Sequence, residues 1–385
     1  MSERAAAVPG RARRPVLGWV MAMAVSLGLA ACSSSPSRPK PADLPPVVPL
    51  LATELAWTLQ LGEAAPLLQP AVAGERLVLA SRSGSVSMVE AASGRVVWQA
   101  ETGTSLATGA GSDGRTVAVI TQANELLAMR DGKTAWRVRL PARSFTPPLV
   151  AGERVFVLMG DRSVAAFDAD SGGRLWGQRA RTEALVLGQS GTLLPVGDTL
   201  VVGLSGRLVG LDPLSGALRW DAPVAIARGA NEVERLVDLV APVSRVHSSV
   251  CARAYAATVG CVDASRGRVL WTRAAQGVTG VAGDAQRLFG TESNGRVLAW
   301  DRATGEPAWE SDRLLHRRLS APLAVGRVVV VGDETGLVHV LSREDGSEMT
   351  RLSTDGSALA GAPVLAADLL VVQTVRGGVY AWRPR

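Results

Sequence analysis

The sequence predicts an all-β protein, an eight-bladed β-propeller whose four-stranded antiparallel blades are closed by the N-terminal strand. Three observations support this fold class. A pattern of about forty residues repeats along the chain, each copy holds short Val- and Leu-rich runs between turn residues, and an incomplete copy stands at each end. Repeats of this length, each made of a few strands, are typical of propellers.

The repeat is clearest in residues 145–176, FTPPLVAGERVFVLMGDRSVAAFDADSGGRLW. Each copy ends at a Trp or, in one case, a Met, and the successive spacings are 38, 40, 44, 51, 38 and 40 residues. The terminal residues are Trp98, Trp136, Trp176, Trp220, Trp271, Trp309 and Met349.

Each copy reads as four strands. Three Val- and Leu-rich runs are separated by Gly-Asp, Gly-Glu, Asn-Gly or Ser-Gly, which indicate tight turns between strands. A further strand begins at the Trp. No later segment keeps a 3.6-residue apolar period, so helices are not expected after the N-terminal region.

The two ends of the chain complete one another. Residues 361–385 supply three strands of an eighth blade and then stop, while residues 54–62, ELAWTLQLG, resemble a Trp-bearing last strand with no blade before it. Trp57 is therefore expected to complete the eighth blade, which would also cover exposed strand edges. The alternative, two smaller β domains, leaves both half-blades unexplained.

The Trp that ends all but one of the copies permits two interpretations. The indoles could form stacking platforms for a sugar or a quinone. A large flat side chain at the same place in every blade is more simply a packing wedge between neighbouring sheets, and we expect this role.

The N-terminal region has the features of a bacterial secretion signal. An Arg-rich start is followed by VLGWVMAMAVSLGLAA, the length of a signal-peptide core rather than of a membrane span, so residues 1–31 are expected to be removed. The run ends in LAAC, which resembles the lipobox of bacterial lipoproteins and implies that Cys32 is lipidated. In enterobacterial lipoproteins, an Asp directly after the lipidated Cys resembles a signal for retention in the inner membrane. This chain has Ser33 at that position, so the resemblance favours the outer membrane, with the protein lipid-anchored on its periplasmic face.

Three segments follow from this interpretation. The signal peptide covers residues 1–31, a lipidated tether rich in Pro and Ser covers residues 32–50, and the propeller covers residues 51–385. The tether cannot build a core and is expected to be extended.

The charge does not indicate nucleic-acid binding. The formal net charge is +6, and the signal peptide carries +3 of it through four Arg against one Glu, which leaves +3. The remaining Arg residues stand singly beside turn glycines, as in Gly94-Arg95 and Gly267-Arg268, and form no basic stripe with interleaved aromatics.

The Gly-x-x-x-Trp ending, preceded by Asp-x-x-x-Gly, resembles the repeat of pyrroloquinoline-quinone dehydrogenases and their non-enzymatic relatives. Among the relatives the chain is similar to the BamB family, propeller lipoproteins of the outer-membrane β-barrel assembly machinery. The specific features are the insertion at residues 228–243, RGANEVERLVDLVAPV, and residues 310–322, ESDRLLHRRLSAP. The resemblance implies a non-enzymatic scaffold that binds the barrel-assembling subunit BamA and assists folding and insertion of barrels, with unfolded outer-membrane proteins as clients.

The resemblance also implies a partner-binding site. A Leu-x-Leu-Arg segment and a Glu-x-x-Arg-Leu-x-Asp insertion match this chain, except that Gly188 replaces the Arg and Val240 stands where a second acidic residue is common. For the two leucines, ordinary inter-blade core remains the alternative. The implied partner-binding residues are Leu185, Leu187, Glu232, Arg235 and Asp238.

Residue patterns for catalysis are not found. A quinone-dependent dehydrogenase of the related family has an adjacent Cys-Cys pair, which is missing, and His247, His316 and His339 are too far apart in sequence to suggest a metal site. No G-x-S-x-G is present. We therefore expect no catalytic residues, no metal and no cofactor. The dehydrogenase, and a propeller that binds a glycan or small ligand in its central channel, remain the alternatives.

Two cysteines remain after lipidation. Cys251 and Cys261 flank SVCARAYAATVGCVD, and a hairpin folded about Ala256 sets them opposite one another. A cross-strand pair at about 4.5 to 5.5 Å between α-carbons is within disulfide reach, and the periplasm is oxidising. A disulfide is predicted, with two small buried apolar residues as the alternative.

Overall fold

A computed structural model of the chain describes residues 39–64, 68–179, 185–227, 231 and 235–384. The predicted signal peptide and Cys32 lie outside the described residues. Residues 41–385 form one compact unit. Every regular element among the described residues is a β-strand, and none of them forms a helix suited to crossing a bilayer.

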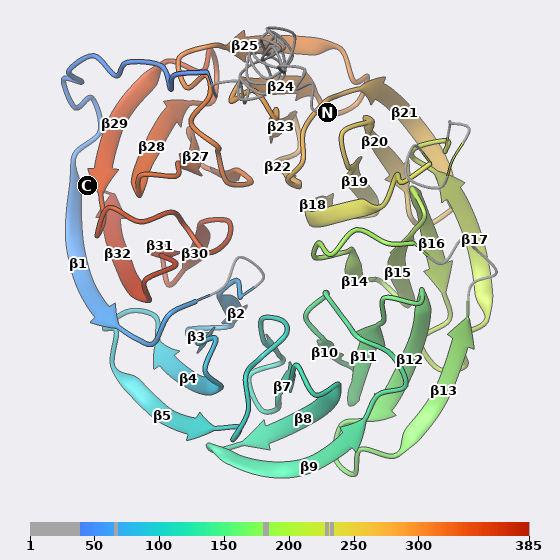
Figure 1. Ribbon diagram of the computed structural model, residues 1–385. Helices are drawn as coiled ribbons and strands as arrows, with labels where there is room; N and C mark the ends of the chain where they lie inside the picture. Colours follow the sequence, from blue (N-terminus) through green and yellow to red (C-terminus); the bar gives the residue numbers. More distant parts are fainter. Residues whose placement is uncertain (1–38, 65–67, 180–184, 228–230, 232–234, 385) are drawn as a thin grey trace, which may run out of the picture. The chain divides into compact units, whose positions relative to one another are not determined.

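The strands of this unit form eight sheets of four antiparallel strands, arranged as a closed ring (Figure 1). The first strand of each blade lies nearest the axis and the last forms the outer rim. The prediction of eight four-stranded blades is confirmed.

The first four blades follow the chain order. Blade one is β2 (Ala71–Ala73), β3 (Arg76–Ala80), β4 (Ser85–Glu90) and β5 (Val96–Glu101); blade two is β6 (Gly111–Ser112), β7 (Val117–Ile120), β8 (Glu125–Arg130) and β9 (Lys133–Arg139); blade three is β10 (Leu149–Ala151), β11 (Arg154–Leu158), β12 (Ser163–Asp168) and β13 (Arg174–Arg179); blade four is β14 (Leu193–Val196), β15 (Thr199–Leu204), β16 (Arg207–Leu211) and β17 (Leu218–Pro223).

The remaining blades continue this order, except that the eighth takes its outer strand from the N-terminal end. Blade five is β18 (Leu239–Val246), β19 (Ser249–Ala254), β20 (Thr258–Asp263) and β21 (Arg268–Ala274); blade six is β22 (Val281–Gly283), β23 (Arg287–Thr291), β24 (Val297–Asp301) and β25 (Pro307–Ser311); blade seven is β26 (Leu323–Val325), β27 (Val328–Gly332), β28 (Leu337–Ser342) and β29 (Glu348–Ser353); blade eight is β30 (Val364–Ala366), β31 (Leu369–Gln373), β32 (Gly378–Pro384) and β1 (Thr53–Gln60).

The ring is closed by the pairing of β1 with β32. Leu55 lies opposite Trp382 and Thr58 opposite Tyr380, with an irregularity between Leu55 and Trp57. The inner strands β2 and β30 are also in contact. The expected completion of the eighth blade by Trp57 is therefore confirmed, and it gives the backbone groups of β32 a partner strand on both edges.

The core lies between the blades rather than at the axis. The two middle strands of each blade are packed on both faces by neighbouring sheets, so their side chains are buried without alternation, as in Leu77–Ala80 of β3 and Val117–Ile120 of β7. This explains the continuous Val- and Leu-rich runs in the sequence, since a strand with only one buried face would alternate apolar and polar residues.

The Trp and Gly of the repeat fit one another across neighbouring blades. The indole of Trp136 in blade two donates its N–H to the carbonyl of Ala169 in blade three, at 2.9 Å. Its ring lies against Gly172, where a Cβ would come within 2.7 Å of the ring and where φ is +74°. Glycine is therefore needed for two reasons, and the indoles act as packing wedges as expected.

The segment before β1 lies against blades six and seven. The N–H of Ala42 donates to Leu315 O at 2.9 Å, and that of Leu50 to Met349 O at 2.8 Å. Leu44 packs on a buried cluster that includes Leu314. The folded unit thus begins at Pro41, whereas the sequence placed the boundary at residue 51. The composition of this segment indicated an extended chain, but not that a blade edge would supply partners for it.

Candidate functional site

The two segments singled out as a partner-binding site lie at the same end of the blades. The Leu185–Leu187 loop (residues 185–187) connects β13 to β14, and the insertion at residues 228–243 belongs to the connection from β17 to β18. With four antiparallel strands in each blade, these outer-to-inner connections share one face with the turns between second and third strands.

Described residues at both ends of the insertion are held by the turns of blades four and five. The N–H groups of Val224 and Ala225, just before it, donate to Gly206 O at 3.0 and 2.9 Å. Tyr255 N–H donates to Asp238 O at 3.0 Å, and Val237 is buried.

The last residues of the insertion belong to a strand and not to a loop. Strand β18 begins at Leu239 and pairs Val240 with Arg253 of β19. Val240, which stands where the sequence comparison expected a second acidic residue, is buried in the sheet opposite Arg253.

The two leucines lie at the surface side of this arrangement. Leu185 is 38% exposed, and Leu187 is half-buried. Neither belongs to the buried clusters that pack the described blades together. The structure therefore does not place them in the inter-blade core, and their role in binding a partner stays a prediction.

Asp238 joins the loop to the insertion. Its Oδ2 accepts the N–H of Leu187 at 2.9 Å, and its Oδ1 accepts from Arg162 Nη2 at 2.9 Å. The same Arg162 nitrogen donates to Leu185 O at 2.8 Å. The side chains of Arg162 and Asp238 are 7% and 17% exposed, so this is a largely desolvated ion pair. Asp238 makes these bonds within its own chain, and its predicted role in a partner contact stays a prediction.

The other implied residues are less fully defined. Glu232 lies outside the described residues. Arg235 is half-buried, and its backbone N–H donates to Asn231 O at 3.3 Å. Gly188 directly follows Leu187 in the chain and is exposed. It stands where the Leu-x-Leu-Arg pattern has an Arg, so no cation follows the two leucines here.

An open groove of about 680 Å³ runs beside the loop over blades four and five. Its walls come from the loop, the segment after β17, the insertion, and the turn and outer strand of blade five, and Ile226 is 70% exposed. Its lining is predominantly apolar: Leu187, Pro223, Val224, Ala225, Ile226, Leu236, Val237, Tyr255, Ala256, Ala257, Thr258, Thr272 and Ala274. A concave apolar surface beside exposed leucines suits a protein side chain as an anchor.

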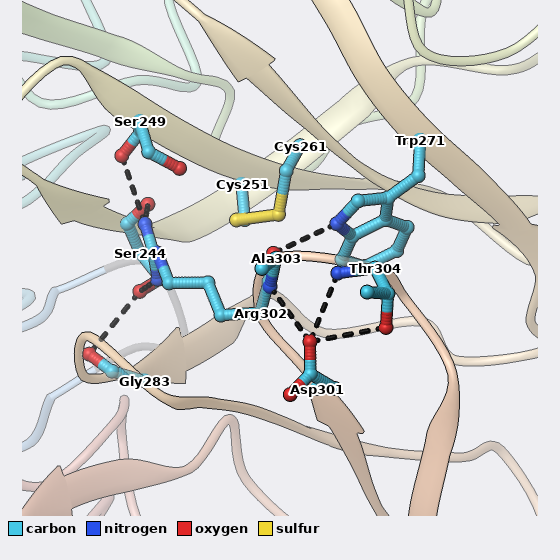
Figure 2. The surroundings of a disulfide bond; sticks show 10 residues. All are labelled: Ser244, Ser249, Cys251, Cys261, Trp271, Gly283, Asp301, Arg302, Ala303 and Thr304. Carbon is cyan, nitrogen blue, oxygen red and sulfur yellow. Dashed lines mark hydrogen bonds between the residues drawn. A yellow bond between two sulfur atoms is a disulfide. The ribbon is translucent and has the colours of Figure 1, made fainter.

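The predicted cysteine pair lies away from this face, in the middle of blade five. Cys251 and Cys261 are opposite one another in the β19–β20 ladder, with α-carbons 3.9 Å apart, and their sulfurs are joined (Figure 2). Nearby, Arg302 of blade six donates to Ser244 Oγ and Ser249 O at 2.7 and 2.8 Å. Burial lowers the pKa of Arg302 to about 10, and the carboxylate of Asp284 opposes this effect.

The mature protein is predicted to carry this disulfide. Mass spectrometry after alkylation in denaturant without reductant should find Cys251 and Cys261 unmodified, with a mass about 2 Da lower than that of the dithiol because two hydrogens are lost. Prior reduction should make both thiols available. Alkylation of both cysteines without reductant would show that they are free thiols.

Groups suited to other chemistry are dispersed in the described part of the chain. No cluster of three or more His, Cys, Asp or Glu residues there could hold a metal ion. One end of the central channel forms a hollow of about 180 Å³ with a neutral lining that includes Gln69, Gln189, Ser190, Thr279 and Ser320. His339 is buried in blade seven between two carboxylates.

The chain is similar to known proteins over most of its length. The sequence profile described as "Outer membrane protein assembly factor BamB" matches residues 82–311. A protein of that name from Burkholderia pseudomallei is 38% identical over 371 residues, which cover 95% of this chain and 97% of the relative. This chain belongs to the BamB family. The resemblance found in the sequence is therefore confirmed.

Solved structures with a similar fold include a member of this family and a protein outside it. The crystal structure of BamB from Moraxella catarrhalis has a TM-score of 0.79 at 27% identity, over 86% of this chain and all of that one. Quinohemoprotein alcohol dehydrogenase from Comamonas testosteroni has a TM-score of 0.67 at 12% identity, over 89% of this chain and 78% of its own. The second likeness concerns the fold alone.

Proposed function

We propose that this protein is a non-enzymatic scaffold in the assembly of outer-membrane proteins. It binds a BamA-like barrel-assembling subunit, assists folding and insertion of β-barrels, and receives unfolded outer-membrane proteins as clients. Membership of the BamB family supports this role, because the relatives are named as outer membrane protein assembly factors.

The observation that carries the proposal is the joined surface above blades three to five. The Leu185–Leu187 loop and the insertion come from different connections, yet Asp238 and Arg162 hold them together beside one apolar groove. A fixed apolar surface needs little ordering when a partner binds, so more of the contact energy remains available for affinity.

The double substitution Leu185→Asp with Leu187→Asp should abolish capture of the barrel-assembling subunit. Burial of two leucines is worth about 3 kcal/mol, which corresponds to a loss of affinity of roughly a hundredfold. Affinity is measured with the purified periplasmic part of the partner, and circular dichroism checks that the β fold is kept.

A matched control changes two leucines elsewhere on blade four. Leu214 and Leu218 are each 65% exposed and lie at the opposite end of the blade, so changing both to Asp should leave binding intact. Equal loss of binding in both double variants, or loss of the fold in the first, would contradict the assignment of the surface.

The proposal places the protein on the periplasmic face of the outer membrane, lipid-anchored through Cys32. Changing Cys32 to Ala should leave an unprocessed precursor that no longer fractionates as a mature lipoprotein, because the acylated residue is missing. Processing is followed by the mass of the N-terminal peptide and by fractionation of membranes. Unchanged cleavage and unchanged membrane association would contradict the anchor.

A further inference from the structure

One turn of the candidate surface has an unusual residue. Six blades join their second and third strands by a four-residue turn, in which the N–H of the fourth residue donates to the carbonyl of the first. The fourth residue has a positive φ in each. These residues are Gly84, Asn124, Arg162, Gly295, Gly336 and Gly377.

Arg162 is the exception among these six positions. Glycine adopts a positive φ without steric cost, and asparagine tolerates it better than other residues. Arg162 has φ of +60°, the conformation that a long side chain disfavours. Strain of this kind persists where the surrounding structure fixes it, and it points to a function for the residue.

The side chain of Arg162 has a specific environment. It is 7% exposed, and Nη2 donates both to Leu185 O and to Asp238 Oδ1. Asp238 in turn accepts the N–H of Leu187. One buried guanidinium thus connects a turn of blade three, the loop before blade four and the segment before blade five.

We infer that Arg162 is a positioning residue for the partner-binding surface, an inference that rests on the proposed function. It contacts no partner itself. Through Leu185 O and Asp238 it fixes the backbone at Leu185 and at Leu187, so that the apolar side chains are already in place when the partner arrives. Without it, the partner must order the loop on binding, at a cost in affinity.

The test is Arg162→Gly, which gives blade three the residue that most of the other turns have. Because glycine fits the positive φ, the blade should stay folded, with a melting temperature lowered only by the loss of the Arg162–Asp238 pair. Affinity for the periplasmic part of the barrel-assembling subunit should fall by about tenfold, and hydrogen exchange at the Leu187 amide should become faster. Arg162→Lys, which keeps a donor at the same place, should retain most of the affinity.

Asn124→Gly is the matched control, since it makes the same backbone change at the same turn position in blade two. It should alter neither the Leu187 amide nor binding. The inference is overturned if Arg162→Gly binds the partner as the wild type does, if Arg162→Lys is as weak as Arg162→Gly, or if Asn124→Gly weakens binding equally. Should the wild type itself not bind the subunit, the proposed function fails, while exchange at Leu187 still decides whether Arg162 fixes the loop.

Discussion

Replacing Arg253 with Met should lower the free energy of unfolding by about 3 to 5 kcal/mol, because it leaves the buried carboxylate of Glu292 without its cation. Arg253 lies on β19 of blade five with no exposed surface, and its Nη2 is 3.0 Å from Glu292 Oε1 in blade six. Burial lowers the pKa of Arg253, and the charge and hydrogen bond of Glu292 oppose this effect.

The packing around Arg253 explains why the site does not adapt to its loss. The guanidinium donates to Thr291 O at 2.8 Å and lies 5.8 Å from the ring of Trp300. Gly277 and Gly290 border it so closely that a Cβ at either position would overlap the guanidinium. A shorter or uncharged side chain therefore leaves a cavity as well as an unpaired carboxylate.

Urea unfolding of three variants measures the effect. The double variant Arg253→Met with Glu292→Met should recover much of the stability lost in Arg253→Met, because no buried charge remains. Arg95→Met, which removes the exposed Arg95–Glu90 pair of blade one, should change the unfolding midpoint little. Similar midpoints for Arg253→Met and Arg95→Met would contradict the account.

Acid should destabilise the protein through a buried cluster in blade seven. His339 is fully buried, with Nδ1 2.8 Å from Glu348 Oε1 and Nε2 3.2 Å from Asp333 Oδ2. Arg317 Nε contacts the same oxygen of Asp333 at 3.0 Å, and Arg351 Nη2 contacts Glu348 Oε2 at 2.6 Å.

The pKa values of the cluster set the pH range. Burial raises the pKa of both carboxyl groups, but the hydrogen bonds and charge of His339 oppose this effect. Together with hydrogen bonds from Thr335 to Asp333 and with Arg351 at Glu348, they outweigh burial and hold the pKa of both groups at about 2. For His339, burial lowers the pKa, and the two carboxylates outweigh it and raise the pKa above 6.5.

The direction of each pKa shift determines the pH range in which that group stabilises the fold. The carboxylates contribute stability that is fully present above pH 4.5, the higher of their ordinary values, and lost as the pH falls toward 2. His339 contributes stability that is fully present below pH 6.5 and lost as the pH rises through its raised pKa. The cluster therefore stabilises the fold most between pH 4.5 and 6.5.

His339→Gln should reduce stability most in that range, by an amount on the order of 2 kcal/mol, since each carboxylate loses the charged imidazole and keeps only its Arg partner. Between pH 5 and 3 the variant should also show a shallower decline in the free energy of unfolding than the wild type, because its carboxyl pKa values are closer to ordinary ones. Parallel curves for variant and wild type across this range would contradict the assignment.

The sequence predicts the ring because its period is carried by local signals. The Trp recurs in every blade but the seventh, which has Met349, and the turn glycines and Val-rich runs recur with it. The unmatched ELAWTLQLG at the N-terminal end explains the closure through Trp57. These features depend on residues close in sequence or repeated at a fixed interval, so composition and spacing are enough to find them.

The buried ion pairs, including the Arg162–Asp238 pair that holds the Leu185–Leu187 loop, could not be predicted in this way. Arg162 and Asp238 are separated by 76 residues, and their pairing depends on how three blades are set side by side. The sequence offered one signal, an Arg at a turn position that elsewhere holds Gly or Asn, but its meaning requires the turn geometry. The docking of residues 42–50 was missed for a similar reason, since its partners, Leu315 and Met349, are far along the chain.

The most direct test of the account is site-specific photo-crosslinking in cells. A photoreactive residue is placed at Leu185 and, as a control, at Leu365, which is 39% exposed but belongs to β30 of blade eight. Crosslinks to the barrel-assembling subunit should form from position 185 and not from position 365. If position 185 gives no such crosslink, or if both positions give it equally, the surface above blades three to five is not where this protein binds its partner.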